Sequence, residues 1–385
     1  MSSQVRAGLI GCGALSLMGI LPQITQPDAR ERLELLAVCD VVEERARRTA
    51  EAFDVPLYFS DPSELIAVRD LDLVIVATPI PFHYELAMRA LQAGKHVYVQ
   101  KTMATTYREA SEMVRTARRL GLKLAAAPGQ MLSPSIRKMR ELVASGALGK
   151  VYWAWGSTGG WGHDYEPQRQ GEDVLHSVDP TWYYKAGGGP LVDVTVYVLH
   201  SLTGILGPAL RVAAMSGVAV PTRQWRDKTI QLEVDDNSLL MLDFGDSTFA
   251  VAGGHSCMTG RLVTWGSMGI YGSEGAIETL EIEPLSGHPS RLYITSSHGL
   301  AEIGGEREGE YLPDSWLPYV DARHAAIPEP HVYADIMHLV DCIMADKDPI
   351  PSGEHAAHVV EIIEKGYVAA RTGRAQHLES TFNLP

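Results

Sequence analysis

A lysine at the end of a predicted strand is the residue of this chain best placed to do chemistry. The apolar run His96–Val99 has the composition of a buried strand, and Gln100 and Lys101 follow it directly. A charged residue at the carboxyl end of a parallel strand faces the crevice where open α/β sheets bind ligands. There an ammonium can hydrogen-bond a substrate hydroxyl and steady the alkoxide while hydride leaves carbon. The alternative is a solvated surface lysine, which fits a strand end less well.

A glycine-rich turn near the N-terminus predicts a nucleotide site in the same sheet. The turn consists of Gly11, Gly13, Ala14 and Leu15. It follows the strand-like run Val5–Ile10 and should open a helix, whose unpaired backbone N–H groups favour a pyrophosphate. Ser16 stands where the GxGxxG fingerprint has its third glycine, so a tight structural turn is the competing interpretation.

Asp40 strengthens the nucleotide interpretation. It ends the predicted strand Leu33–Cys39, where a carboxylate can accept hydrogen bonds from both adenosine ribose hydroxyls. Because it would repel a 2′-phosphate, we expect NAD rather than NADP as the cofactor. The separation from Gly13 is 40 − 13 = 27 residues, longer than the usual ~20. Asp40 could also cap the predicted helix Val42–Phe53, and the two roles are compatible.

The elements that must position these groups change character along the chain. Residues 1–128 alternate apolar runs with helical patterns, which predicts a doubly wound parallel sheet of the Rossmann type. Beyond Pro128 the strands grow longer and follow one another without crossover helices, which predicts a large, open, mainly antiparallel sheet. We therefore expect an α/β chain with an NAD-binding domain at 1–128 and a domain for substrate binding and oligomerisation at 129–385. The last helix, 354–372, is placed to pack back near the first domain.

Composition excludes several kinds of partner. The 47 acidic and 33 basic residues give a formal net charge of −14, which repels nucleic acid and anionic lipid. The sequence has no basic patch and no run of the ~18 apolar residues that a membrane span needs. Its four cysteines, and the scattered His255, His298 and His324, lack the spacing of metal ligands. We expect a cytoplasmic protein with reduced thiols, no metal, and neither nucleic acid nor membrane as partner.

Taken together, these motifs resemble the glucose–fructose oxidoreductase / inositol dehydrogenase / rhizopine-catabolism (Gfo/Idh/MocA) family. The matching segments follow the family's order over nearly the whole chain: Gly11-x-Gly13, Thr78-Pro79-x-x-x-His83, Ala93-Gly94-Lys95-His96-Val97, Lys101, Ser145-Gly146-x-x-Gly149-Lys150, Gly187-Gly188-Gly189-Pro190-Leu191-Val192-Asp193 and Pro351-Ser352-Gly353-Glu354.

The resemblance implies NAD(P)-dependent redox chemistry at a sugar or polyol carbon, and a homodimer or homotetramer built on the open sheet. It assigns the catalytic lysine to Lys101 and further cofactor contacts to Thr78, Pro79, His83 and Gln100. The chain departs from the family where Gln100-Lys101-Thr102 replaces Glu-Lys-Pro. Gln100 removes a negative neighbour that would raise the lysine pKa, and Thr102 removes the fixed φ of proline. Ile80 stands where the family usually has asparagine.

A predicted helix after the glycine run carries Asp193, Tyr197 and His200 at i, i+4 and i+7. At 3.6 residues per turn these positions lie within roughly 60° of one another, so they share one face. The family usually shows Asp-x-Gly-x-His-x-x-Asp here, and a tyrosine in the histidine position resembles the branches in which tyrosine relays the proton. Tyr197 with Lys101 is the first choice for the acid/base, although His200 has the more suitable unperturbed pKa. A solvent-facing helix is the alternative.

Aromatic and polar residues between the two predicted domains suggest a carbohydrate site. The substrate candidates are Trp161, His163, Asp179, Trp182 and Lys185, together with Asp193. Indole faces stack on sugar C–H surfaces, while carboxylates and imidazoles bind hydroxyls. An aromatic loop core would have the same composition.

Three functions compete for this pattern. The first is NAD-dependent oxidation of a ring secondary alcohol of a sugar, glycoside or cyclitol. The second is a redox-neutral glycoside hydrolase that oxidises C3 transiently and eliminates the aglycone, which requires an extra base for the C2 proton. The third is a non-catalytic dinucleotide sensor, against which the presence of Lys101, Asp193 and a proton-relay residue weighs.

Overall fold

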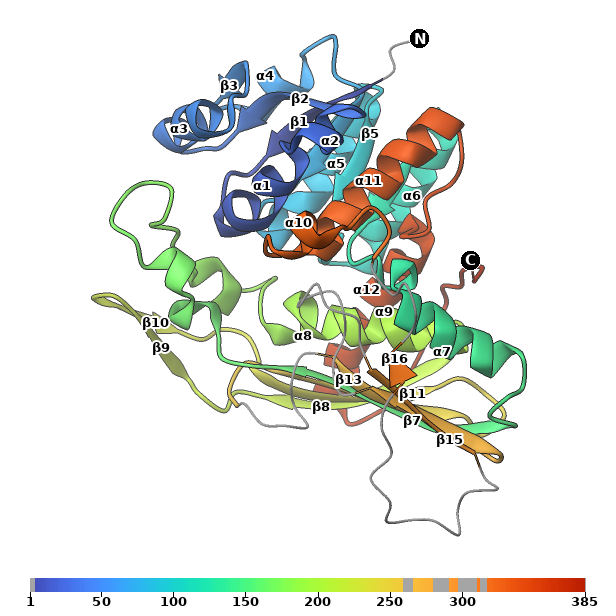
Figure 1. Ribbon diagram of the computed structural model, residues 1–385. Coiled ribbons are helices and arrows are strands. Elements are labelled where there is room, and N and C mark those ends of the chain that lie inside the picture. Colours follow the sequence, from blue (N-terminus) through green and yellow to red (C-terminus); the bar gives the residue numbers. More distant parts are fainter. Residues whose placement is uncertain (1–3, 259–265, 280–290, 297–309, 312–316, 385) are drawn as a thin grey trace.

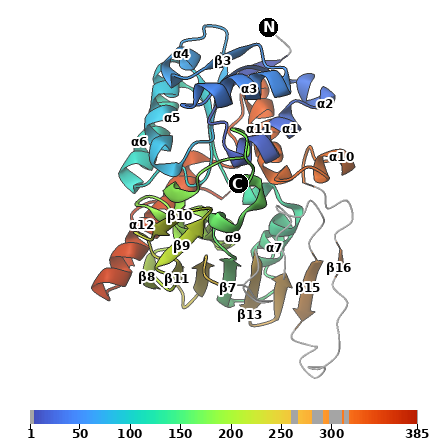
Figure 2. The same cartoon turned by 90° about the vertical axis from the view of Figure 1, so that its left-hand side faces the viewer.

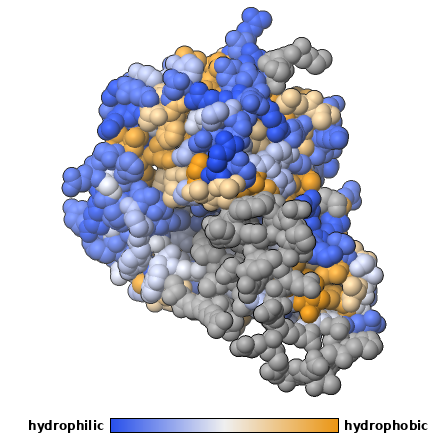
Figure 3. All heavy atoms as spheres, in the orientation of Figure 1, coloured by the Kyte–Doolittle hydropathy of each residue, from blue (hydrophilic) through white to orange (hydrophobic). Residues whose placement is uncertain are grey.

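The computed structural model describes residues 4–258, 266–279, 291–296, 310–311 and 317–384. Figure 1 shows two sheets one above the other, with helices around the upper sheet and a layer of helices between the two. Hydrophilic side chains cover much of the upper part of the face seen in Figure 3. Among the described residues, no helix combines the length and apolar character needed to cross a bilayer.

The first sheet has six parallel strands in the order β3-β2-β1-β4-β5-β6. Their bounds are β1 (Val5–Ile10), β2 (Leu33–Cys39), β3 (Leu57–Phe59), β4 (Leu73–Val76), β5 (His96–Val99) and β6 (Leu124–Ala126). All four residues of β4 are buried, as in a strand covered on both faces. The strand order reverses between β1 and β4, which creates a binding crevice at their carboxyl ends. The predicted Rossmann sheet is therefore confirmed.

Helices cover both faces of this sheet. They are α1 (Leu21–Ile24), α2 (Pro27–Arg30), α3 (Glu43–Phe53), α4 (Pro62–Ile66), α5 (His83–Gln92) and α6 (Tyr107–Leu120). Local signals set their ends: Thr106 and Glu109 form a capping box at the start of α6, and Gly121 ends it in the left-handed conformation.

The end of the chain completes the first layer. In helix α11 (Pro330–Ala345), Val332 and Ile336 are buried in one cluster with Leu9 and Leu73 of the first sheet. Helix α12 (Gly353–Thr372) joins the two halves, since Val360 packs with the first sheet and Val359 with the second. In Figure 2, α11 lies among the helices of the first sheet, and α12 extends beside β8 of the second. Helix α11 therefore packs with the first sheet, although its residues come after residue 128, where the sequence suggests that the first domain ends.

The second sheet has nine strands in the order β16-β15-β14-β13-β7-β12-β11-β8-β17. Their bounds are β7 (Val151–Gly159), β8 (Arg211–Gly217), β11 (Asn237–Asp243), β12 (Phe249–His255), β13 (Ser267–Gly272), β14 (Gly275–Thr279), β15 (Arg291–Ser296), β16 (Glu310–Tyr311) and β17 (Gln376–His377). Only the β7–β12 pair is parallel among the pairings of this sheet in the described residues. The prediction of a mainly antiparallel sheet is confirmed.

One face of the second sheet is covered by helices. Helix α9 (Thr195–Leu206) is buried at every residue except the last, so it lies in the core and not in solvent. Helices α7 (Pro134–Ala144) and α8 (Pro190–Asp193) lie beside it. Helix α10 (Ala322–Ala325) instead contacts Gln23 of the first domain, and β9 (Thr222–Trp225) and β10 (Lys228–Gln231) form a separate hairpin. Helices α8 and α9 separate the second sheet from the carboxyl ends of the first, and the cavity described next lies there (Figure 1).

Candidate active site

A cavity of about 940 Å³ lies where the strand ends of the first sheet face α8 and α9. Its size is at the upper end of the range for ligand pockets, ~300–1,000 Å³. The predicted residues that line it are Gly11, Gly13, Ala14, Leu15, Asp40, Thr78, Pro79, Gln100, Lys101, His163, Asp179, Trp182, Asp193 and Tyr197. Four predicted site residues do not line it: His83, Trp161, Lys185 and His200. The molecular surface is hollowed between the two halves (Figure 3).

The glycine turn forms one end of the cavity. Gly11 has φ +101°, and a Cβ there would lie 2.4 Å from the Ala77 carbonyl oxygen, so only glycine fits. A Cβ on Gly13 would meet nothing within 4 Å, which leaves its backbone open to a ligand. Ser16 is buried and donates its hydroxyl to the Gly11 carbonyl at 2.6 Å. The serine at the third fingerprint position therefore braces the turn from inside.

Asp40 lies at the end of β2 on the rim of the same turn. Its Oδ2 accepts the Cys12 N–H at 3.0 Å, and its Oδ1 accepts the Val42 N–H at 2.9 Å and the Arg45 guanidinium at 3.1 Å. Arg45 also donates to the Val174 carbonyl at 3.0 Å, which links the carboxylate to a loop of the second domain. The glycine turn and the carboxylate at the end of the second strand, both on one cavity of about 940 Å³, fit a dinucleotide.

His83 acts behind the cavity wall and not in it. It is fully buried, with Nδ1 2.8 Å from the Thr102 carbonyl and Nε2 2.7 Å from the Thr78 carbonyl. Burial lowers its pKa despite these two carbonyls, so the ring is neutral and donates to one of them. It joins the loops that follow β4 and β5, and so positions Thr78 and the segment after Lys101.

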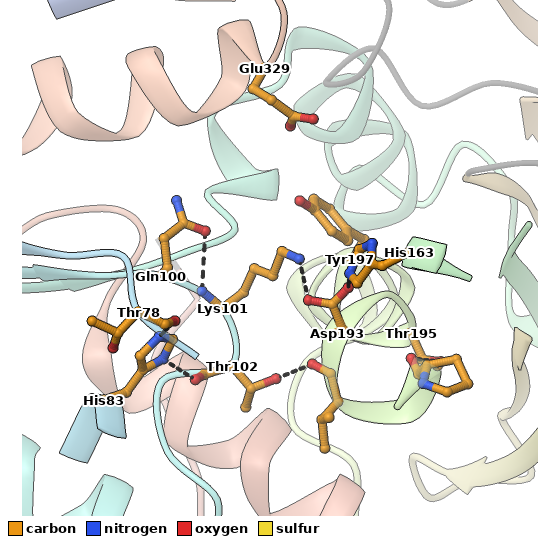
Figure 4. Close-up of polar contacts among 12 residues, drawn as sticks. Thr78, His83, Gln100, Lys101, Thr102, His163, Asp193, Thr195, Tyr197 and Glu329 are labelled. Atoms are coloured by element: carbon orange, nitrogen blue, oxygen red, sulfur yellow. Dashed lines mark hydrogen bonds and ion pairs between the residues drawn. The ribbon is translucent and has the colours of Figure 1, made fainter. Parts of the chain in front are cut away.

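Lys101 and Asp193 meet inside the cavity. The Lys101 Nζ lies 2.6 Å from Asp193 Oδ1, and the ammonium is 5.7 Å from the centre of the Tyr197 ring (Figure 4). Burial would raise the pKa of Asp193, but Lys101 and His163 outweigh it and hold that pKa well below its usual range. Thr102 donates its hydroxyl to the Val192 carbonyl, which ties the end of β5 to α8.

His163 extends this pair into a row of alternating charges. Its Nε2 lies 3.2 Å from Asp193 Oδ2, and its Nδ1 contacts Glu166, which accepts the Arg169 Nε at 2.5 Å. Burial lowers the pKa of His163, but Glu166 and Asp193 outweigh it and raise that pKa. The pKa of Glu166 falls to about 2, since His163 and Arg169 outweigh its burial. Cavity-facing groups are thereby held in fixed charge states.

Tyr197 stands beside this row, on the other helix. The chain turns at Val194, between α8 and α9, so Asp193 and Tyr197 belong to separate helices. The Tyr197 hydroxyl lies 3.1 Å from His331 Nε2, and His331 Nδ1 lies 3.5 Å from Glu329 Oε2. Glu329 lines the cavity. The sequence did not identify Glu329 or His331 as site residues, because no local spacing links the start of α11 to Tyr197.

His200 lies outside this group. Its ring packs 4.6 Å from that of His355, and its pKa falls to about 3 because it is buried and lies near His358. The shared-face prediction assumed one continuous helix from Asp193 to His200, but the chain turns at Val194 between α8 and α9. His200 is therefore carried past the cavity into the core.

The substrate candidates divide in the same way. Trp182 lines the cavity with its ring 5.9 Å from that of His163, and Asp179 lines it while accepting the Lys228 ammonium at 2.7 Å. Lys185 instead pairs with Glu233 at 2.5 Å, and Trp161 is 58% exposed outside the cavity. The sequence predicts substrate contacts for both residues, but neither lines the cavity, and Glu233 holds the Lys185 ammonium outside it.

Comparison with known proteins places both parts of the chain in one family. Residues 5–127 match the model of the Gfo/Idh/MocA oxidoreductase family with its NAD-binding Rossmann fold, and residues 136–278 match the Gfo/Idh/MocA C-terminal domain. D-glucoside 3-dehydrogenase of Escherichia coli K12 is 31% identical over 217 residues, covering 54% of this chain and 56% of that protein. The chain spans about half the length of the first curated relatives it matches.

Longer matches are more distant. D-apiose dehydrogenase of Paraburkholderia graminis is 24% identical over 383 residues, covering 97% of this chain and 90% of that protein. Among solved structures, levoglucosan dehydrogenase in complex with NADH and levoglucosan superposes with a TM-score of 0.78 at 20% identity, covering 97% of this chain and 99% of that one. At that identity the likeness supports the fold alone.

Proposed function

Because the chain belongs to the Gfo/Idh/MocA oxidoreductase family with its NAD-binding Rossmann fold, we propose that it oxidises a ring secondary alcohol of a sugar, glycoside or cyclitol by NAD-dependent hydride transfer. One observation carries the proposal: the Lys101–Asp193 pair faces the same cavity as the glycine turn and Asp40. The sugar dehydrogenases among the relatives support the substrate class.

The cofactor residues follow from the cavity. The backbone at Gly11 and Gly13 would hold the pyrophosphate, Asp40 the adenosine ribose, and Thr78, Pro79 and Gln100 the nicotinamide end. NAD, when bound, supplies the acceptor for hydride. The carboxylate of Asp40 supports NAD over NADP.

Lys101 donates to the oxygen of the reacting alcohol and stabilises the charge that develops there as its proton leaves. Asp193 orients that ammonium from behind, Lys101 and His163 keep Asp193 ionised, and Glu166 keeps His163 protonated. Tyr197 is the nearby hydroxyl that can exchange a proton with the substrate. His163 and Asp193 also offer hydrogen bonds to neighbouring hydroxyls, and the Trp182 face fits a sugar ring.

The outer face of the second sheet supports a homodimer or homotetramer. Exposed apolar side chains lie next to one another across its strands, since Leu239 pairs with Met215 and Phe249 with Trp153. An apolar stripe of this kind is typical of an interface. Light scattering coupled to gel filtration, on the wild type and on Met215→Lys, tests the assembly: a wild-type monomer would rule it out.

The function is tested with purified protein, NAD and a panel of free sugars, cyclitols and chromogenic glycosides, following NADH and aglycone release together. We expect stoichiometric NADH without aglycone release, abolished in Lys101→Met. Aglycone release that needs only catalytic NAD and leaves no net NADH would replace the proposal with the redox-neutral hydrolase. NAD binding with neither product would favour the sensor.

A further inference from the structure

A buried histidine connects the Tyr197 hydroxyl to a carboxylate across the cavity. His331 lies 3.1 Å from Tyr197 through Nε2 and 3.5 Å from Glu329 through Nδ1. The His331 side chain is 5% exposed and that of Glu329 is 22% exposed. In Figure 4, Glu329 stands apart from the Lys101–Asp193 pair, on the side toward which the Tyr197 hydroxyl points. Tyr197, His331 and Glu329 thus form a path from the Tyr197 hydroxyl to a carboxylate that solvent can reach.

The backbone conformation of Glu329 and its packing against Gly19 fix the position of this residue. Glu329 has φ 60° and ψ 44°, a left-handed conformation that non-glycine residues seldom adopt, and it sits between Pro328 and Pro330. A Cβ added to Gly19 would lie 2.7 Å from the Glu329 Cβ, so the glycine leaves room for this residue. Gly19 belongs to the π-helix Ser16–Ile20 that follows the glycine turn. Glu329 is therefore packed against the π-helix that follows the glycine turn.

Electrostatics favour proton transfer toward Glu329. Burial raises its pKa; Lys101 and His163 oppose this rise, while Glu166 and Asp193 reinforce it. Burial, Glu329 and Asp193 also raise the pKa of Tyr197 well above its usual range, so the phenol keeps its own proton. A protonated phenol can accept the substrate proton only if it passes its own proton on, and His331 Nε2 lies within hydrogen-bond distance to accept it.

We propose that Tyr197, His331 and Glu329 form a proton relay that removes the hydroxyl proton of the substrate, an inference that rests on the proposed function. The O–H bond of the alcohol breaks and its electron pair becomes the second bond of the carbonyl as hydride leaves carbon for NAD. The proton moves to the Tyr197 oxygen, the Tyr197 proton to His331 Nε2, and the Nδ1 proton of His331 to Glu329. Tyrosine and histidine end neutral, and the carboxylate becomes a carboxylic acid.

The relay requires the His331 tautomer that carries its proton on Nδ1. It also requires the 3.5 Å gap to Glu329 to shorten when substrate is bound, as catalytic hydrogen bonds commonly do. The protonated Glu329 then exchanges with water, because part of its side chain is exposed. In the reductive direction the same steps return a proton to the carbonyl oxygen.

Three substitutions test the relay: Glu329→Gln, His331→Gln and His331→Ala. We expect kcat to fall about 10- to 100-fold in each, with KM and the Kd for NADH unchanged. Added imidazole should restore part of the activity of His331→Ala. Because the relay needs ionised Glu329, the wild-type kcat falls as pH drops through the Glu329 pKa, and this acidic limb should be absent from Glu329→Gln.

A measurement without ligand separates this inference from the proposed function. Infrared titration of the wild type, minus that of Glu329→Gln, should show one carboxyl that titrates above the usual glutamate range and shifts in His331→Gln. Asp28→Asn is the matched control, since Asp28 pairs with His324 at 2.9 Å and does not line the cavity. Wild-type kcat and pH profile in both Gln variants would overturn the relay. A wild-type protein that reduces no NAD would overturn the proposed dehydrogenase function. The infrared titration would then still decide whether Glu329 and His331 are coupled.

Discussion

Lys101 Nζ and Asp193 Oδ1 lie 2.6 Å apart although 92 residues separate them in the chain. Lys101 comes from the end of β5 in the first sheet, and Asp193 from α8 above the second. Their side chains are 15% and 5% exposed, so each would be a poorly solvated charge without the other. The Lys101 ammonium is thus oriented by a carboxylate from the other half of the molecule.

We expect Lys101→Met to lower kcat by about 10²- to 10⁴-fold, because the variant loses both the hydrogen bond to the substrate oxygen and the charge that stabilises it. NADH affinity, measured by fluorescence titration, should change little. Lys185→Met is the matched control, since Lys185 pairs with Glu233 outside the cavity. A Lys101→Met variant with near-wild-type kcat would remove the central residue of the proposed mechanism.

Tyr197 and His200 should differ sharply when substituted. Tyr197→Phe removes the hydroxyl beside Lys101, and we expect kcat to fall about 10²-fold or more at constant NADH affinity. His200→Gln should lower the melting temperature but leave the pH dependence of kcat unchanged, because His200 is buried against His355 and His358. Rate profiles of the two purified variants across pH decide the assignment: loss of the profile in His200→Gln would make His200 the base.

The contrast between these residues shows how far sequence reasoning reaches. Lys101 and Asp40 are predictable because strand ends follow from local patterns, and parallel strand ends share one edge of the sheet. The family resemblance brought Asp193 into the site. Glu329 and His331 are not predictable in this way, since their position depends on α11 packing against the first sheet after more than two hundred intervening residues.

Lys185 and His200 are predicted site residues that do not line the cavity. Each has a residue type suited to a sugar site and a position close to one in the chain. Contacts with β-strands and helices far away in sequence decide their directions, as Glu233 does for Lys185. Composition identifies such candidates, but only tertiary packing selects among them.

Asp40 should control the choice of cofactor together with Arg45. Asp40→Ala removes the acceptor for the ribose hydroxyls and releases Arg45, which can then meet a 2′-phosphate. We expect NADH affinity to fall about 10- to 100-fold, since each hydrogen bond to a charged group contributes about 1.5–3 kcal/mol, while NADPH affinity rises. Calorimetric titration with both dinucleotides checks this, and Asp40→Ala/Arg45→Ala should lose the gain for NADPH. Unchanged selectivity would mean that Asp40 serves only as a cap.

Asp335 should make the stability of the protein depend on pH near neutrality. The side chain is buried, and its Oδ2 accepts the Gly129 N–H at 3.0 Å and the Tyr98 hydroxyl at 3.3 Å. Burial raises its pKa to about 7, although both hydrogen bonds oppose the shift. In the unfolded chain its pKa is about 3.9, so between these values the folded state binds one more proton than the unfolded state. Stability therefore falls as pH rises toward 7.

The maximum slope from one such group is about 1.4 kcal/mol per pH unit. Asp335→Asn keeps an oxygen acceptor but cannot ionise, so its free energy of unfolding should increase relative to the wild type between pH 5 and pH 7. Urea unfolding at a series of pH values measures the difference. Asp346→Asn serves as control, because that carboxylate is 93% exposed. Parallel stability curves for the wild type and Asp335→Asn would show that Asp335 is ionised throughout, and that its two hydrogen bonds compensate for its burial.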